Sequence, residues 1–464
     1  MHIKHSVMII LLSSLSEIKQ NSVDQISSHN THDPEKLDKS LFTENNDLGF
    51  IIKKNPQNGM IKRKVHEGEV SGYYYNNHVG YYVMYFRDYT GISYSTEHNH
   101  LNPTQYTSPQ AVINIISEVL PAYNKIVDKD KDMSYINTLY IMTIRIDNIK
   151  TIKQVVDKFS DYHVSFELNE FFKQSHYYSV IIKTKRTIYH LLNFTQVIFT
   201  TILSTNSISA YHVSDSSASK LIKCVNIINA PYYVRYIMAS RILYLKDFNI
   251  LKQELENYND HKITLNHGTT AQHRRNFIKK IFSFKNDIID IGCGDGSYAI
   301  PFCKKIEQGL LYHAYDIDQE QLKILNKKII KNNILNIKVY NSLEEFYDQL
   351  IQAKNVDIII TEVVEHMGEQ DSRNFLIDVL NMVSDKFNKI IITTPNYEFN
   401  DNYCLNGKFR HWDHKWEMKR DQFQKFINDI IQSIKCTYKY DVKFVDIGDV
   451  VDGISCTQGV IISK

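Results

Sequence analysis

The stretch Asp287-Ile-Ile-Asp-Ile-Gly-Cys-Gly-Asp-Gly-Ser297 decides the fold that we expect for the second half of the chain. Its apolar residues predict a short buried strand that runs directly into a glycine-rich turn. Gly292, Gly294 and Gly296 permit a tight turn and a close approach of the backbone to a ligand, which a side chain would block. A helix is expected next, over residues 298–306. Strand, glycine turn and helix in this order are typical of nucleotide-type cofactor sites in α/β domains.

Strand and helix patterns alternate around this stretch, from Asn266 to about residue 396. We expect helices over 271–282, 319–332, 343–353 and 371–385, and strands over 311–315, 337–340, 356–361 and 389–394. Such alternation predicts a doubly wound parallel sheet, in which ligands bind beyond the carboxyl ends of the strands.

Two aspartates at strand ends indicate which cofactor the glycine turn serves. A glycine motif alone is also compatible with dinucleotide-binding proteins, but Asp290 inside the strand, in a D-x-G-x-G-x-G pattern, favours S-adenosylmethionine. Asp316 follows the next apolar run about twenty residues after the glycines, where a carboxylate can accept hydrogen bonds from both ribose hydroxyls. The sequence therefore favours an S-adenosylmethionine-dependent methyltransferase domain with a Rossmann-like fold.

A candidate metal site lies in Thr361-Glu-Val-Val-Glu-His366, directly after the strand expected at 356–361. If this stretch forms a helix, Glu362, Glu365 and His366 share one face, because positions three and four apart are neighbours on a helix. Two carboxylates and one imidazole suit Mg²⁺ or Mn²⁺, while catalytic zinc stays an alternative. A further ligand is expected from His411 or His414 downstream.

The first half of the chain is expected to form a separate α+β domain over 41–250, after an N-terminal segment, 1–40, of uncertain role. Residues 7–12 predict a first strand rather than a cleaved signal, followed by a polar tail over 17–39. We expect strands within 73–86 and at 177–182, and helices over 110–120, 150–159 and 188–203. Histidines 98 and 100 are expected to be surface residues. A charged linker, 246–262, should lead to the methyltransferase domain, 260–464.

Composition bounds the class of protein. The 464 residues carry a formal net charge of +2, so no overall basic field indicates a nucleic-acid binder and any RNA contact must be local. No segment approaches transmembrane length, so no membrane partner is expected. Six cysteines occur without a C-x-x-C pair, which favours a reduced, cytoplasmic protein.

Two further motifs accompany the glycine stretch and Glu362-Val-Val-Glu-His366: Thr394-Pro-Asn-Tyr-Glu-Phe-Asn400, and Arg410-His-Trp-Asp-His414 with the following Trp416, Glu417 and Arg420. Together the four motifs resemble those of the small-RNA 3′-terminal ribose 2′-O-methyltransferases, the Hua-enhancer family. More loosely, Asp47 to Pro56, Tyr106 to Leu120 and Tyr177 to Leu203 resemble the amino-terminal domain of the bacterial branch, whose members work beside a polynucleotide kinase-phosphatase-ligase in RNA repair.

The resemblance implies roles for particular residues. It implies metal ligands at Glu362, Glu365, His366 and His414, and contacts to RNA at Arg410 and Arg274. Trp412 and Lys419 depart from the family pattern, in which we expect His and Thr. The full cofactor-binding set that we expect comprises Asp290, Gly292, Gly294, Gly296, Asp316 and Ser342.

The function expected is methyl transfer from S-adenosylmethionine to the 2′-OH of the 3′-terminal ribose of RNA, in RNA repair or small-RNA end protection. A divalent ion that takes the vicinal 2′ and 3′ oxygens would stabilise the forming alkoxide, and His366 or His411 would accept the proton. Two alternatives stay open: a methyltransferase for a small molecule or protein, and a scaffold whose N-terminal half activates an RNA ligase.

Overall fold

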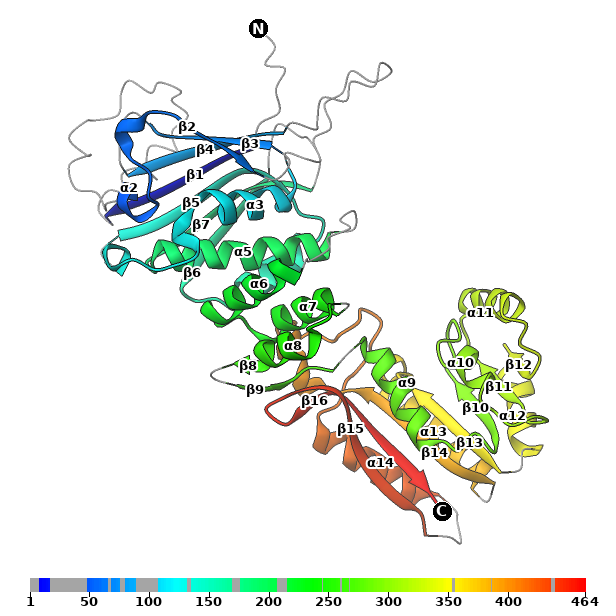
Figure 1. Cartoon of the computed structure of the whole chain (residues 1–464). Coiled ribbons are helices and arrows are strands. Elements are labelled where there is room, and N and C mark those ends of the chain that lie inside the picture. Colours follow the sequence, from blue (N-terminus) through cyan, green and yellow to red (C-terminus); the bar gives the residue numbers. More distant parts are fainter. Residues whose placement is uncertain are drawn as a thin grey trace. The chain divides into compact units, whose positions relative to one another are not determined.

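The computed structural model describes residues 8–16, 48–65, 68–75, 80–88, 107–131, 135–168, 176–206, 215–243, 245–258, 261–266, 268–352, 355–384, 386–434 and 439–464. The chain divides into two compact units, Met1–Asn259 and Asp260–Lys464 (Figure 1). Histidines 98 and 100 and the expected polar tail over 17–39 lie outside the described residues. Among the described helices, none combines the length and the apolar character needed to cross a membrane.

The N-terminal unit is built on an antiparallel sheet with the strand order β2-β3-β4-β1-β5-β7-β6. The strands are β1 (Met8–Ser16), β2 (Ile61–Val65), β3 (Gly68–Tyr74), β4 (Tyr81–Asp88), β5 (Tyr135–Arg145), β6 (Tyr162–Leu168) and β7 (Tyr177–Thr184). The strand expected near the amino terminus is confirmed as β1. Because β1 pairs with both β4 and β5, these residues belong to the sheet of this unit rather than to a separate N-terminal segment.

Helices complete this unit. The expected helices are confirmed as α3 (Pro109–Val119), α4 (Ile149–Val156) and the largely buried α5 (Ile188–Thr205). The others are α2 (Leu48–Ile51), α6 (Asp215–Ile227), α7 (Tyr232–Ile242) and α8 (Phe248–Glu256), followed by β8 (Asn257–Tyr258). The prediction of a linker over 246–262 is wrong, because α8 lies within these residues. Leu251 and Leu255, four residues apart, form the apolar stripe that this helix buries.

The C-terminal unit is the expected doubly wound domain. Its five parallel strands are β10 (Asp287–Ile291), β11 (Tyr312–Tyr315), β12 (Ile337–Tyr340), β13 (Val356–Thr361) and β14 (Phe387–Pro395). The helices are α9 (Thr270–Ile281), α10 (Ala299–Cys303), α11 (Gln319–Lys331), α12 (Leu343–Gln352), α13 (Glu369–Val383) and α14 (Arg420–Ser433). The parallel order β12-β11-β10-β13-β14 agrees with the alternation in the sequence.

The sheet continues past β14 in a way that the sequence did not indicate. β16 (Ile454–Ser463) pairs antiparallel with β14, β15 (Asp441–Val451) pairs antiparallel with β16, and β9 (His261–Thr264) pairs with β15. The sheet is therefore mixed and not purely parallel.

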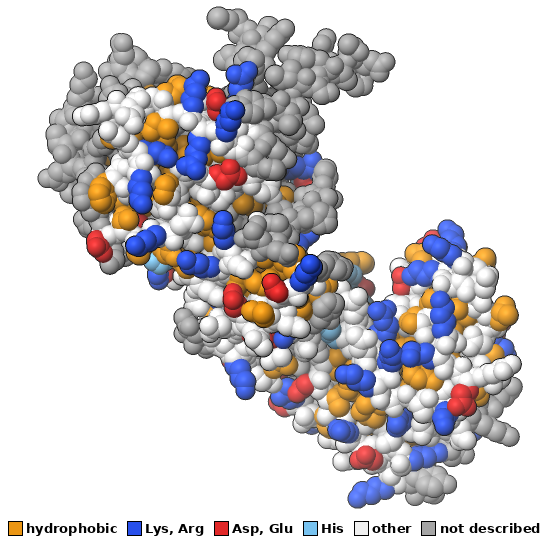
Figure 2. Space-filling view, in the orientation of Figure 1, with side chains coloured by type: hydrophobic (Ala, Val, Ile, Leu, Met, Phe, Trp, Pro, Cys, Tyr) orange, Lys and Arg blue, Asp and Glu red, His pale blue; other side chains and the backbone are white. Residues whose placement is uncertain are grey.

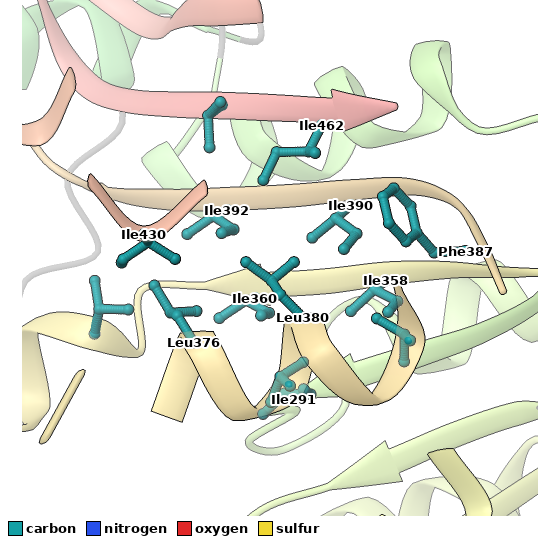
Figure 3. Close-up of a cluster of buried hydrophobic side chains, with 14 of the residues drawn as sticks. Ile291, Ile358, Ile360, Leu376, Leu380, Phe387, Ile390, Ile392, Ile430 and Ile462 are labelled. Carbon is teal, nitrogen blue, oxygen red and sulfur yellow. The ribbon is translucent and has the colours of Figure 1, made fainter. Parts of the chain in front are cut away.

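Alternate residues of each central strand build two hydrophobic cores. On one face, Ile358 and Ile360 of β13 pack with Leu376 and Leu380 of α13 (Figure 3). On the other face, Ile359 packs in a second cluster with residues of α9, α10 and α11. Both faces are covered because successive side chains of a strand point in opposite directions. Figure 2 shows Lys and Arg side chains scattered over the visible face of this unit, among Asp and Glu and uncharged side chains.

Candidate active site

A cavity of about 720 Å³ opens where β10, β11 and β13 end. Its walls include Gly292 after β10, Asp316 after β11, Glu362 after β13, and His366 with Asp413 from later segments. The carboxyl ends of neighbouring parallel strands meet at one edge of the sheet, which explains why residues from distant parts of the sequence line one space. The cavity therefore lies where the strand alternation predicts a ligand.

The glycine turn holds its shape through bonds to β11. The amides of Gly292 and Cys293 donate to the carbonyl of Tyr315 at 2.8 and 3.0 Å. Gly292 has a φ of +75°, and a Cβ there would lie 2.4 Å from Cγ2 of Val363. Only glycine combines this backbone conformation with that close approach. Gly294 and Gly296 also have positive φ and continue the same turn.

The other expected cofactor residues occupy different positions. Asp316 lines the cavity, and its carboxylate accepts the amides of Gly294 and Asp318 at 2.7 and 2.8 Å. Ser342 lies at the start of α12, with its hydroxyl 3.5 Å from the amide of Glu345, next to the cavity residue Leu343.

Asp290 lies behind the turn instead of in the cavity. It is fully buried, and its carboxyl accepts a hydrogen bond from the hydroxyl of Tyr312 at 2.6 Å. Burial raises the pKa of Asp290 to about 7. Along β10, Ile291 faces the cavity, so Asp290, one residue earlier, faces the opposite side of the sheet. The expectation that Asp290 contacts the cofactor directly therefore has no support in the geometry.

The Glu-x-x-Glu-His stretch does not form the expected helix. Glu362 leaves β13 with a left-handed φ of +55°, a short 3₁₀ turn covers Val364–His366, and α13 begins only at Glu369. A non-glycine residue with positive φ is strained, and such strain is common at functional sites. The prediction that Glu362, Glu365 and His366 share a helix face is thus wrong.

Three of the four expected metal ligands nevertheless come together. One ligand atom each from Glu365, His366 and His414 lie within 4.8 Å of one another. Glu365 is 1% exposed; its Oε2 accepts from the hydroxyl of Thr394, and its Oε1 has no hydrogen-bond partner among the described residues. Burial, and next the charge of Glu362, raise the pKa of Glu365 well above its usual value. A bound cation would relieve both effects, so the donor set fits a divalent ion.

Two hydrogen bonds bring His414 to this cluster. The amide of Lys415 donates to the carbonyl of Glu365 at 2.8 Å, and the indole N–H of Trp416 donates to the carbonyl of Val364 at 2.9 Å. These bonds attach the segment after η9 (Tyr397–Tyr403) to the 3₁₀ turn. His414 therefore joins residues about fifty positions earlier in the chain.

Two carboxylates orient the histidines. Asp413 accepts from Nδ1 of His366 at 2.9 Å and also pairs with Nδ1 of His411, while Glu417 accepts from Nδ1 of His414 at 2.6 Å. This pairing leaves Nε2 of each ring to bind a metal or to accept a proton. Burial lowers the pKa of His366, against the opposing effect of Asp413.

Glu417 is itself well supported. It also accepts from the side chain of Asn400 and from the amide of Arg410, at 2.5 and 2.7 Å. Burial would raise the pKa of Glu417, but the hydrogen bonds from His414 and Asn400 outweigh it and hold the pKa below its usual value. Glu417 is therefore an ionised, fixed acceptor for the His414 ring.

Glu362, the fourth expected ligand, is engaged elsewhere. Its carboxylate accepts from the hydroxyl of Thr393 at 3.3 Å and pairs with Nη1 of Arg274 at 3.2 Å. Arg274 also donates to the hydroxyl of Tyr298. The structure thus places Arg274, expected to contact RNA, in a largely buried ion pair.

Arg410, the other residue expected to contact RNA, also bonds within the protein. Its guanidinium donates to Asn400 and to the carbonyl of Asn396, both at 2.9 Å, and lies 5.0 Å from the centre of the Tyr403 ring. These contacts brace the segment that carries His411 and His414.

The site includes residues to which the sequence alone assigns no role. Asp413 and Glu417 lie within three positions of the expected histidines, a spacing that could have indicated carboxylates that orient them. Thr394, which donates to Glu365, begins a motif that only the family resemblance connects with the site.

Comparison with known proteins identifies both units. The family model described as Hen1 N-terminal domain matches residues 40–260, and the model described as Methyltransferase domain matches residues 288–386. A chain in the solved structure of the Pnkp1/Rnl/Hen1 RNA repair complex matches with a TM-score of 0.71 at 20% identity, over 98% of this chain and 100% of that chain. The two chains therefore share a fold.

The curated relatives that match are small RNA 2′-O-methyltransferases. The chain is 35% identical over 108 residues to the small RNA 2′-O-methyltransferase of Gallus gallus, and the aligned residues cover 22% of this chain and 27% of that protein. It is 29% identical over 188 residues to the small RNA 2′-O-methyltransferase of Arabidopsis thaliana, and this alignment covers 36% of this chain and 19% of that protein. The match thus spans less than a third of the length of these two relatives. The matches to the two domain models show a chain in which a Hen1 N-terminal domain precedes a methyltransferase domain.

Proposed function

We propose that this protein transfers a methyl group from S-adenosylmethionine to the 2′-OH of the 3′-terminal ribose of RNA. The main support is a single cavity that is lined by the glycine turn and by His366. His366 also belongs to the cluster of metal-type ligands, so the cavity reaches that cluster. The names of the curated relatives support RNA as the substrate. The alternative of a small-molecule or protein substrate has no specific contact in its favour.

The glycine turn and Asp316 would hold the cofactor. The backbone at Gly292 leaves room for a ligand where a side chain would intrude, and the Asp316 carboxylate at the cavity wall is an acceptor for ribose hydroxyls. A cavity that holds both ligands would place the sulfonium methyl next to the RNA ribose.

Glu365, His366 and His414 would hold a divalent ion, Mg²⁺ or Mn²⁺, with Glu362 adjacent. Such an ion supplies Lewis-acid stabilisation for an alkoxide that forms from a ribose hydroxyl. Of the two histidines expected as proton acceptors, the contacts favour His411. Asp413 fixes its Nδ1, its ring is exposed, and its Nε2 is available, whereas His366 is itself a member of the metal-type cluster.

The N-terminal unit would place this activity beside a kinase-phosphatase-ligase. The match to the Hen1 N-terminal domain and the shared fold with a chain of the Pnkp1/Rnl/Hen1 complex support such a partner. The same comparison supports a role in RNA repair. We also propose a cytoplasmic location, which the free thiols of the five described cysteines favour.

The activity is tested with labelled S-adenosylmethionine and four RNAs that differ only at the 3′ end: a free diol, a 3′-phosphate, a 3′-deoxy end and a 2′-deoxy end. Only the diol should be labelled efficiently, with added Mn²⁺, because a metal that holds both vicinal oxygens needs both hydroxyls. The substitution His414→Ala should abolish transfer and leave cofactor affinity unchanged. Labelling of the 2′-deoxy RNA, or of none of the four, would overturn the proposal.

The partner is tested by size-exclusion chromatography of the full chain mixed with Pnkp1 and Rnl from the same organism. Co-elution as one complex is expected. Separate elution at micromolar concentration of each component would argue against the repair assembly without affecting the methyltransferase proposal.

A further inference from the structure

An exposed aromatic side chain stands at the edge of the candidate active site. Trp412 is 89% exposed, although Trp is one of the most apolar side chains in the protein and the chain contains two of them. The other, Trp416, packs on Phe426 and donates to the carbonyl of Val364. Trp416 is therefore held in place by the fold, while the indole of Trp412 lies in solvent.

A tight turn directs Trp412 outward. The amide of His414 donates to the carbonyl of His411 at 3.4 Å, so Trp412 and Asp413 are the two central residues of a four-residue turn. The flanking residues are fixed, because Asp413 pairs with His411 and with His366, and His414 pairs with Glu417. A turn held by these contacts thus presents a solvent-exposed indole beside these ligands.

Trp412 lies close to the metal-type ligands. Consecutive Cα atoms lie about 3.8 Å apart, so the Cα of Trp412 lies within about 7.6 Å of that of His414. The ring of Trp412 also lies 5.7 Å from the ring of His411, centre to centre. If the terminal ribose lies at the cluster of Glu365, His366 and His414, the base attached to that ribose lies within reach of the indole.

We propose that Trp412 is a substrate-positioning residue on which the 3′-terminal base of the RNA stacks. The inference rests on the proposed function, which places the terminal ribose at the cluster. Aromatic rings bind bases mainly through their π faces, so this contact would accept any of the four bases. A single exposed apolar side chain is common on protein surfaces, and the fixed turn beside the ligands distinguishes this one.

The experiment measures KM and kcat for methyl transfer with the full-length protein, using RNAs that end in a normal nucleotide or in an abasic ribose with both hydroxyls. Trp412→Ala should raise KM for the normal RNA about tenfold to a hundredfold, the loss expected for one base–aromatic stack, with little change in kcat. Trp412→Tyr should restore most of the affinity. With the abasic RNA, the original protein and Trp412→Ala should have the same raised KM.

The control is Leu335→Ala, which removes another exposed apolar side chain (94% exposed) just before β12, at the opposite edge of the sheet. It should leave both KM values unchanged. Equal KM for the original protein and Trp412→Ala on the normal RNA would overturn the stacking proposal while transfer itself continues. Absence of transfer by the original protein to every RNA would instead overturn the proposed function, and the stacking proposal with it.

A direct readout accompanies the kinetics. Because Trp412 is exposed and Trp416 is packed, RNA binding should protect most of the iodide-accessible tryptophan fluorescence in the original protein, and the abasic RNA should not. Protection that is equal for both RNAs would contradict a contact to the base.

Discussion

The ion pair between Arg274 and Glu362 stabilises the end of β13, and substitutions of these two residues can test its contribution to the free energy of unfolding. The two side chains are 11% and 20% exposed and their charged atoms are 3.2 Å apart. Burial disfavours the charged guanidinium, but Glu362 and then Tyr298 outweigh it and raise the pKa of Arg274. The change Arg274→Met keeps the length of the side chain but leaves Glu362 without its cation. The free energy of unfolding should fall by about 3 kcal/mol.

The assay is urea denaturation of the full-length protein and of Arg274→Met, Glu362→Gln and the double variant. Because Glu362→Gln removes the charge that Arg274 compensates, the double variant should lose less than the sum of the two single losses, by about 1–3 kcal/mol. Arg275→Met, on the same helix, serves as the control for loss of a positive charge and should have little effect on stability. Additive losses, with weaker RNA binding as the main effect of Arg274→Met, would refute this reasoning and favour a direct contact to RNA.

Three further predictions follow from other contacts. Gly292→Ala should lower the stability of the fold and, in calorimetric titration, the affinity for S-adenosylmethionine, because the added Cβ would lie 2.4 Å from the side chain of Val363. Gly294→Ala, with a φ of +52° and open space around the Cβ, should cost only about 1–2 kcal/mol of backbone strain. Equal effects of the two substitutions would contradict the collision at Gly292. Glu417→Gln should lower Mn²⁺ affinity about tenfold to a hundredfold in calorimetric titration, since the His414 ring loses its charged acceptor, while cofactor affinity stays the same; unchanged Mn²⁺ affinity would remove this acceptor role. Asp130 accepts hydrogen bonds from two backbone amides at the start of α5, and burial raises its pKa from 3.8 to about 6. The folded state therefore binds this proton more tightly than the unfolded chain does. The stability that results is present below about pH 4 and is lost as the pH rises through 6. Relative to Asp130→Asn, the original protein should therefore lose up to about 3 kcal/mol of unfolding free energy between pH 4 and pH 7 in urea denaturation, and parallel pH profiles would contradict this.

Local pattern was sufficient for much of the C-terminal unit. Alternation and glycine spacing predict the strands before Asp316 and Glu362 and the turn at Gly292, because strand and helix periods are visible in short windows of sequence. The edge of the sheet where these residues meet followed from the parallel order alone. The resemblance added His414, which no spacing argument could select over His411.

Other features depended on distant contacts. The antiparallel pair β15–β16 joins the sheet through the pairing of β16 with β14. The sequence of α8 resembles a linker because charged residues surround Leu251 and Leu255, the two residues that the helix buries. Strand pairing and burial of a single stripe are decided by partners far along the chain, which local composition does not reveal.

The chemistry of the site shows the same division. The local sequence is enough to predict that carboxylates, histidines and glycines gather beyond the strand ends. Their individual roles depend on tertiary contacts, because a left-handed φ at Glu362 replaces the expected helix and the strand period turns Asp290 away from the cavity. It also paired His414 with Glu417 and Glu362 with Arg274, and the charge that each group carries in a buried site depends on such partners rather than on its place in the sequence.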